Sequence, residues 1–232
     1  LILALKKNHK RNYLNRGFFE IGPVFYGTKP YEQKECIFAA RSGEVSSKDW
    51  FDPARKFDLF DIKSDLFNIL EILNFSSNSI KINQESLPLF LHPKKSASIN
   101  IGKNILGYLG YMHPQILKMF DLKQDIICFN ICLSDALELS KKEKISKPAY
   151  YPSQFQTSKR DYSFIIDREI FSIEIVNLIK SLDKKLIKNV RVFDQFEGKD
   201  IENGKKALAI EVTIQSEEKT LTENELENIS EL

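Results

Sequence analysis

The sequence predicts an α+β protein in which short strands and amphipathic helices are arranged in two modules. Three observations support this fold class. Apolar residues recur at helical spacing in some segments and at alternate positions in others. A Gly-Lys-Asn turn joins two neighbouring strand patterns. A basic stretch with few large apolar residues, 141–150, is typical of a linker. We therefore divide the chain into a module at 1–140, a linker at 141–150 and a module at 151–232.

In the first module, the pattern predicts helices at 1–14, 59–73 and 113–120, and strands at 18–25, 34–41, 96–101, 105–112 and 126–133. The helix at 59–73 is predicted because its apolar residues recur along one helical face. The Gly-Lys-Asn at 102–104 is a hairpin signal between two strands. Pro114 is tolerated because it falls in the first turn of its predicted helix.

In the second module, the pattern predicts strands at 161–166, 186–196 and 206–214, a helix at 170–182, and a last helix that begins at the capping box of Thr222 and Glu225. The order strand, helix, strand, strand, helix is that of a ferredoxin-like unit, which adds a fourth strand after the second helix. We expect this chain to end before that last strand and to begin inside the first module.

Composition limits the functional classes. Hydrophobic residues make up 42% of the 232 residues and charged residues 28%, which is typical of a soluble globular protein. No apolar run approaches the roughly 20 residues that a membrane span needs. Residues 1–150 carry 22 Lys and Arg against 16 Asp and Glu, and residues 151–232 carry 12 against 16. This charge distribution alone does not indicate a nucleic-acid-binding protein.

The cysteines and histidines indicate no reactive centre. Three cysteines without a Cys-x-x-Cys pair argue against a disulfide framework and a zinc ribbon, so we interpret them as core residues in a reducing compartment. The three histidines have no metal-like spacing to other ligands. Asp58, Asp61 and Asp65 could bind a hard cation, but acidic residues in the first turns of a helix are already stabilised by its dipole. We predict no catalytic and no metal-binding residue.

The second module offers a binding surface instead. A ferredoxin-like sheet buries one face under its helices and leaves the other face open. Strand alternation places the following residues on the open face: Asp161, Ser163, Arg191, Phe193, Gln195, Ala209, Glu211 and Thr213. Arg191 and Phe193 supply a cation beside a ring, and such faces bind single-stranded RNA by stacking unpaired bases. Packing of this face on another domain is the alternative, and the pattern leaves both open.

Many short stretches, in order along nearly the whole chain, resemble the C-terminal region of the bacterial phenylalanyl-tRNA synthetase beta subunit. They lie at 11–17, 19–25 (Phe-Glu-Ile-Gly-Pro-Val-Phe), 60–65, 91–93, 96–97, 107–114 (Gly-Tyr-Leu-Gly-Tyr-Met-His-Pro), 120–122, 159–161, 192–194, 197–198, 204–206, 209–210 and 219–222. Each piece is weakly specific, whereas their order and spacing are highly specific.

This resemblance implies a class II synthetase-like antiparallel sheet with helices, truncated at its start and without catalytic residues, followed by a ferredoxin-fold anticodon-binding domain. Residues 19–25 occupy the place of a class II signature strand but contain no arginine to hold ATP. In the second module the resemblance and the open face together predict these tRNA-binding residues: Lys159, Arg160, Ser163, Arg191, Phe193, Gln195 and Thr213. Lys159 and Arg160 are expected to contact phosphates at the sheet edge.

The resemblance also implies partners. Two beta and two alpha subunits would assemble in the cytoplasm, and the alpha subunit would use ATP and magnesium to attach phenylalanine to tRNA(Phe). No cofactor is expected on this chain, and the family's editing and magnesium sites would lie upstream of it. Two alternatives stay open: an active class II synthetase, and a small-molecule-sensing or RNA-binding ferredoxin-like module outside a synthetase.

Overall fold

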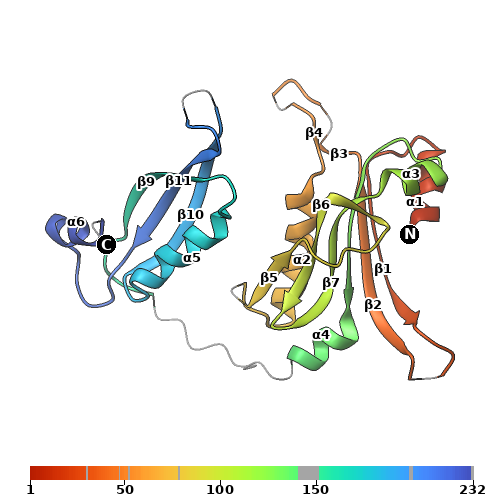
Figure 1. Cartoon of the computed structure of the whole chain (residues 1–232), viewed down its shortest axis with the longest axis horizontal. Helices are drawn as coiled ribbons and strands as arrows, with labels where there is room; N and C mark the ends of the chain where they lie inside the picture. The colour runs from red at the N-terminus through yellow and green to blue at the C-terminus, as the bar shows by residue number, and fades with distance from the viewer. Residues whose placement is uncertain are drawn as a thin grey trace. The chain divides into compact units, whose positions relative to one another are not determined.

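The computed structural model describes residues 1–29, 31–46, 48–51, 53–77, 79–140, 152–198 and 201–230. The chain forms two compact units, Leu1–Lys147 and Pro148–Leu232 (Figure 1). The predicted linker at 141–150 lies outside the described residues, so the predicted boundaries of the modules stay a prediction. Within the described ranges, no helix is long and apolar enough to cross a membrane.

The first unit is built on a six-stranded antiparallel sheet of order β1-β2-β8-β7-β6-β5. Its strands are β1 Arg16–Phe25, β2 Gln33–Ser42, β5 Ile80–Asn83, β6 Leu91–Ile101, β7 Asn104–Met112 and β8 Ile126–Cys132. Its helices are α1 Ile2–His9, α2 Leu59–Ile72, α3 Pro114–Met119 and α4 Leu133–Ser140. The short strands β3 Glu44–Ser46 and β4 Arg55–Lys56 pair with each other.

Helices cover both faces of this sheet, and the central strand β8 shows how (Figure 1). Its Ile127, Phe129 and Ile131 are buried in one core, together with Ile62 and Leu66 of α2. The alternate residues of β8 point to the opposite face. There, Ile126 and Cys128 are buried with Leu5 of α1 and Leu117 of α3. A strand buried on both sides explains its almost uninterrupted apolar sequence.

Most predicted elements of this unit are observed, and the predicted α+β class is confirmed. The predicted first helix is too long, because α1 ends at His9 instead of residue 14. Asn12 adopts a left-handed φ of 63°, which asparagine tolerates better than most residues, and this turns the chain toward β1. The sequence prediction missed β3, β4, β5 and α4, which have between two and eight residues each.

The second unit is a three-stranded antiparallel sheet of order β10-β11-β9 with two helices. Its elements are β9 Ser158–Asp167, α5 Ser172–Leu182, β10 Ile187–Phe196, β11 Lys205–Ile214 and α6 Glu223–Ser230. Side chains of both helices, Val176 and Ile179 from α5 and Leu226 from α6, join the core of the sheet. Among the described residues β9 is paired only on its β11 side, so the expected fourth strand stays a prediction.

Candidate nucleic-acid interface

The central strand β11 defines two different faces of the second sheet. Leu208, Ile210, Val212 and Ile214 are buried in the core beneath the helices. The residues between them are half-buried on the opposite face: Ala207, Ala209, Glu211 and Thr213. We call this opposite surface the open face. The alternation predicted for β11 is therefore observed.

The register of the three strands arranges the open face in four rows across β10, β11 and β9. The rows are Asn189–Thr213–Lys159, Arg191–Glu211–Asp161, Asp194–Ala209–Ser163 and Phe196–Ala207–Ile165. Of the predicted tRNA-binding residues, Lys159, Ser163, Arg191 and Thr213 thus share this face. Side chains in one row are neighbours, because residues opposite each other in antiparallel strands point to the same side.

A β-bulge in β10 changes the rest of the prediction. The pairing runs from Val192, opposite Ile210, to Asp194, opposite Ala209, so Phe193 is an extra residue without a partner on β11. The register assigns Phe193 to neither face, and its position on the open face stays a prediction. The bulge shifts the alternation by one position for the last residues of the strand. Asp194 and Phe196 consequently join the open face.

The predicted position of Gln195 on the open face is wrong. The bulge places Gln195 opposite Leu208, on the side covered by the helices. Ser172, the first residue of α5, donates a hydrogen bond of 3.4 Å to the Gln195 side-chain oxygen. A simple two-residue alternation across 186–196 could not anticipate this placement.

The two basic residues predicted at the sheet edge point to opposite faces. Lys159 lies on the open face and donates hydrogen bonds of 3.1 Å to both carboxylate oxygens of Glu211. Arg160 is opposite Val212, on the helix side, where it pairs with Glu223 of α6. Exposed ion pairs of this kind stabilise little, so each basic group is available for exchange with a phosphate. Of these two residues, Lys159 is the one that can do so on the open face itself.

Apolar side chains form an exposed platform at one end of the open face. Phe196 is 51% exposed and Ile165 65% exposed, and Phe193, the extra residue of the nearby bulge, is 49% exposed. Between them the central strand carries only the small side chains of Ala207 and Ala209. Because the large side chains are on the outer strands and small ones are on the central strand, a flat ring could lie over the alanines between them. Sequence reasoning missed Asp194, Phe196 and Ile165 as members of this surface.

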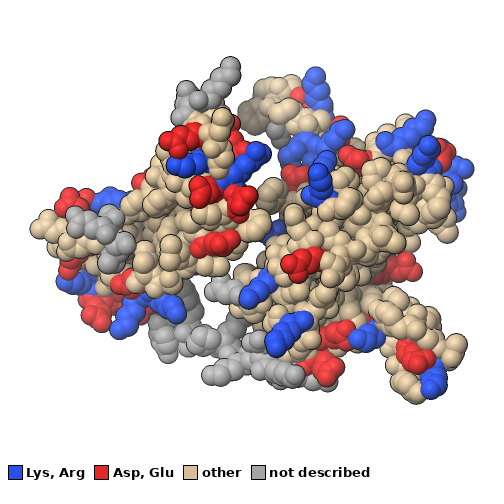
Figure 2. All heavy atoms as spheres, in the orientation of Figure 1, with Lys and Arg blue, Asp and Glu red and all other residues tan. Residues whose placement is uncertain are grey.

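The charge of the open face is mixed. No ion pair links Arg191 to another described residue, while Glu211 opposite it is engaged by Lys159. Asp161 and Asp194 add negative charge to the same face. On the side of the second unit seen in Figure 2, basic and acidic side chains are interspersed. Binding of a polyanion here would therefore depend on stacking as well as on phosphate contacts.

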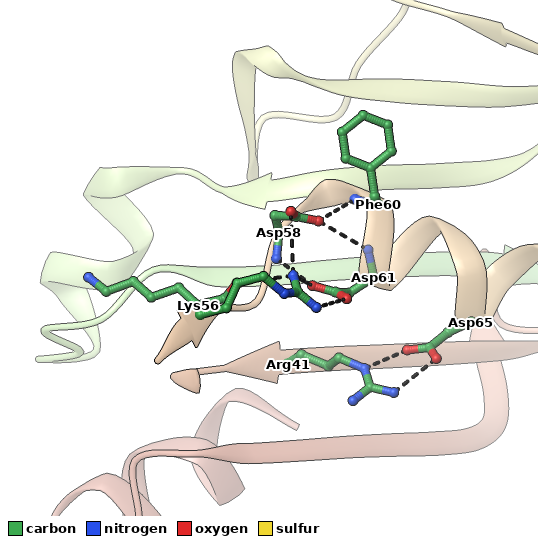
Figure 3. Close-up of polar contacts among 7 residues, drawn as sticks. Arg41, Lys56, Asp58, Phe60, Asp61 and Asp65 are labelled. Atoms are coloured by element: carbon green, nitrogen blue, oxygen red, sulfur yellow. Dashed lines mark hydrogen bonds and ion pairs between the residues drawn. The ribbon is translucent and has the colours of Figure 1, made fainter. Parts of the chain in front are cut away.

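The three aspartates considered for a metal in the first unit have arginine and backbone partners (Figure 3). Arg41 forms two hydrogen bonds with Asp65, of 2.6 and 2.9 Å. Arg55 forms two with Asp61, both of 2.8 Å, and these bonds lower the pKa of Asp61. Within the described ranges, no group of three or more His, Cys, Asp or Glu side chains is arranged to hold a metal ion.

Asp58 begins α2 with a reciprocal capping box. Its carboxylate accepts hydrogen bonds from the backbone N–H groups of Phe60 and Asp61, while Asp61 accepts one from the Asp58 N–H. We expect Asp58→Ala to lower the free energy of unfolding of the first unit by about 0.5–2 kcal/mol, the usual cost of losing an N-cap. Urea denaturation measures this, with Asp58→Ser as the control that restores a cap. Equal stability of both variants and the natural chain would contradict the capping role.

Comparisons with known proteins agree with this architecture. The family model for the phenylalanyl tRNA synthetase beta chain CLM domain matches residues 1–133. The chain belongs to this family. A second model, the ferredoxin-fold anticodon binding domain, matches residues 153–232. The resemblance predicted for the sequence and the ferredoxin-like fold of its second module are therefore confirmed.

Relatives match the chain from end to end. The phenylalanine–tRNA ligase beta subunit of Rickettsia prowazekii is 36% identical over 232 residues, and that of Bradyrhizobium diazoefficiens is 38% identical over 235. The match covers 100% and 99% of this chain, but only 28% and 29% of those relatives. A solved pyrrolysyl tRNA synthetase from Desulfitobacterium hafniense aligns with 60% of this chain and 47% of its own, at 12% identity and a TM-score of 0.40.

Proposed function

We propose that this chain is part of the beta subunit of a phenylalanine–tRNA ligase and that its second unit binds tRNA(Phe). The observation that carries the proposal is the order of the two family models, at 1–133 and 153–232, in one chain. Relatives that carry the beta-subunit name support it. The same match removes the support for a small-molecule sensor. The ligase would be an alpha2-beta2 assembly in the cytoplasm that uses ATP and magnesium.

The residues of this chain favour a partner subunit as the place of chemistry. Residues 19–25 lack an arginine that could hold ATP phosphates. Asp61 and Asp65, two of the three aspartates considered for a metal ion, already bind guanidinium groups. We propose that ATP and magnesium are bound by the alpha subunit. The first unit would serve quaternary contact.

The open face of the second unit supplies groups suited to unpaired bases. Phe193 and Phe196 offer exposed rings, and every base has a flat surface that can stack on such a ring. The Asp194 carboxylate accepts hydrogen bonds without donating any, so it fits a base edge with two N–H donors, as guanine has. Lys159 and Arg191 can contact phosphates without reading sequence. We place anticodon binding on this surface.

The test uses the complete beta subunit copurified with the small alpha subunit. We expect the pair to charge tRNA(Phe), and the present chain alone to give no phenylalanine-dependent ATP–pyrophosphate exchange. A matched control is a beta subunit without residues 151–232, which should leave exchange by the assembly intact while tRNA binding falls. Exchange by the pure chain would show that an active site lies within these residues.

A further inference from the structure

Two cysteines far apart in sequence are direct neighbours in the sheet of the first unit. Cys36 of β2 is paired with Cys132 of β8 in the antiparallel register. Opposed residues in such a ladder have Cα atoms about 4.5–5.5 Å apart and side chains on the same side. Disulfides span Cα separations of about 4.4–6.8 Å. We therefore expect the Cα atoms of these two residues to lie within the range of separations that a disulfide spans.

The two thiols differ in access. Cys36 is half-buried, whereas Cys132 is 8% exposed. Burial raises the pKa of Cys132 to about 11, so this thiol is protonated at neutral pH. A small reagent in solution thus reaches Cys36 first. Cys128, on the same strand β8, is fully buried, and burial raises the pKa of its thiol to about 12.

Polar groups surround the cysteine pair. Tyr26 lies against Cys36, and burial followed by interactions with this thiol raises the pKa of Tyr26. After burial, interactions with the Asp135 carboxylate contribute to the raised pKa of the Cys132 thiol. Lys34 donates hydrogen bonds of 2.8 and 2.9 Å to the same carboxylate. The pair thus lies near a carboxylate that is paired with Lys34, which distinguishes it from thiols packed only among apolar side chains.

We propose that Cys36 and Cys132 form a reversible intramolecular disulfide by exchange with a low-molecular-weight disulfide. The bond would link β2 to β8 at the point where β8 passes into α4. Because the two strands are already hydrogen-bonded neighbours, closure needs side-chain rotation rather than movement of an element. This property goes beyond tRNA binding and does not depend on the proposed function.

The exchange balances in two steps. The Cys36 thiolate attacks one sulfur of the small disulfide, forms a mixed disulfide and releases one small thiolate. The Cys132 thiol then loses its proton to solvent, and the resulting thiolate attacks the Cys36 sulfur and displaces the second small thiolate. The two protein thiols are oxidised and the small disulfide is reduced to two thiols. An excess of the reduced small thiol reverses both steps.

The full chain incubated with oxidised glutathione under native conditions tests the proposal. We expect the chain to lose two hydrogen atoms, its free thiols to fall from three to one, and peptide mapping to join Cys36 to Cys132. Cys132→Ser should instead retain one glutathione on Cys36, because the resolving thiol is gone. Cys128→Ser should form the same 36–132 link as the natural chain. Reduced glutathione should restore the free thiols.

Two results would overturn the proposal. One is a glutathione adduct on Cys36 of the natural chain that persists in place of the link. The other is the absence of any reaction at Cys36 in both the natural chain and Cys132→Ser. Thermal melting of each variant before oxidation shows that it is folded, so that loss of the link cannot be ascribed to unfolding.

Discussion

We expect Phe196→Ala in the complete ligase to weaken tRNA(Phe) binding by about 1–3 kcal/mol, roughly 5- to 150-fold in Kd, the usual cost of losing one stacked base. The bulge in β10 places Phe196 on the open face beside Ala207. Its ring is 51% exposed, so truncation removes little core packing. On the proposed division of roles, adenylate formation by the alpha subunit should not change, because it would not use this surface. Phe193→Ala should have an effect of the same order.

The matched control is Phe171→Ala. Phe171 precedes α5 and is 64% exposed, against 51% for Phe196, so it has the same side chain and is at least as exposed without belonging to the open face. tRNA binding and thermal melting are measured on the same sample of each variant. If Phe196→Ala lowers the melting temperature by several degrees and the folded fraction binds tRNA(Phe) as before, Phe196 belongs to the packing of the unit and not to the interface.

Local patterns in the sequence predicted the regular part of the candidate interface. The alternation of Leu208, Ile210 and Val212 with small or polar residues is a period of two, and it identifies the buried face of β11 without further information. The bulge has no comparable signal, because no glycine marks residues 190–196. The spacing of Phe193 and Phe196 was a weak hint of an irregular strand. Residues three apart in a regular strand point to opposite faces, so two exposed rings at this spacing could share a face only if the alternation were interrupted.

Long-range register could not be predicted from the sequence. The pairing of Cys36 with Cys132 depends on β2 lying beside β8, and intervening strands β5, β6 and β7 are placed on the other side of β8. In the same way, the sequence shows the helical spacing of Asp58, Asp61 and Asp65, but it does not show which arginines pair with them. Arg41 reaches Asp65 from a strand 24 positions earlier. Such contacts follow from tertiary packing and not from local propensity.

The largest change in stability is expected from truncation of a buried ring in the first unit. Phe129 lies at the centre of β8, is 1% exposed and packs in the core beneath α2. Deleting a buried phenylalanine ring typically costs about 3–5 kcal/mol through lost transfer free energy and the cavity that remains. We propose that the modules at 1–140 and 151–232 unfold as separate cooperative units. Phe129→Ala should then lower the melting temperature of the first unit alone.

Leu208→Ala is the reciprocal variant. Leu208 is fully buried in the core of the second unit, where truncation should cost about 2–5 kcal/mol. Calorimetry of the natural chain should resolve two transitions, of which Phe129→Ala shifts one and Leu208→Ala the other. Limited proteolysis during heating assigns each transition, because cleavage sites open first in the destabilised unit. If both substitutions shift one common transition, the two modules unfold cooperatively and the proposed independence is wrong.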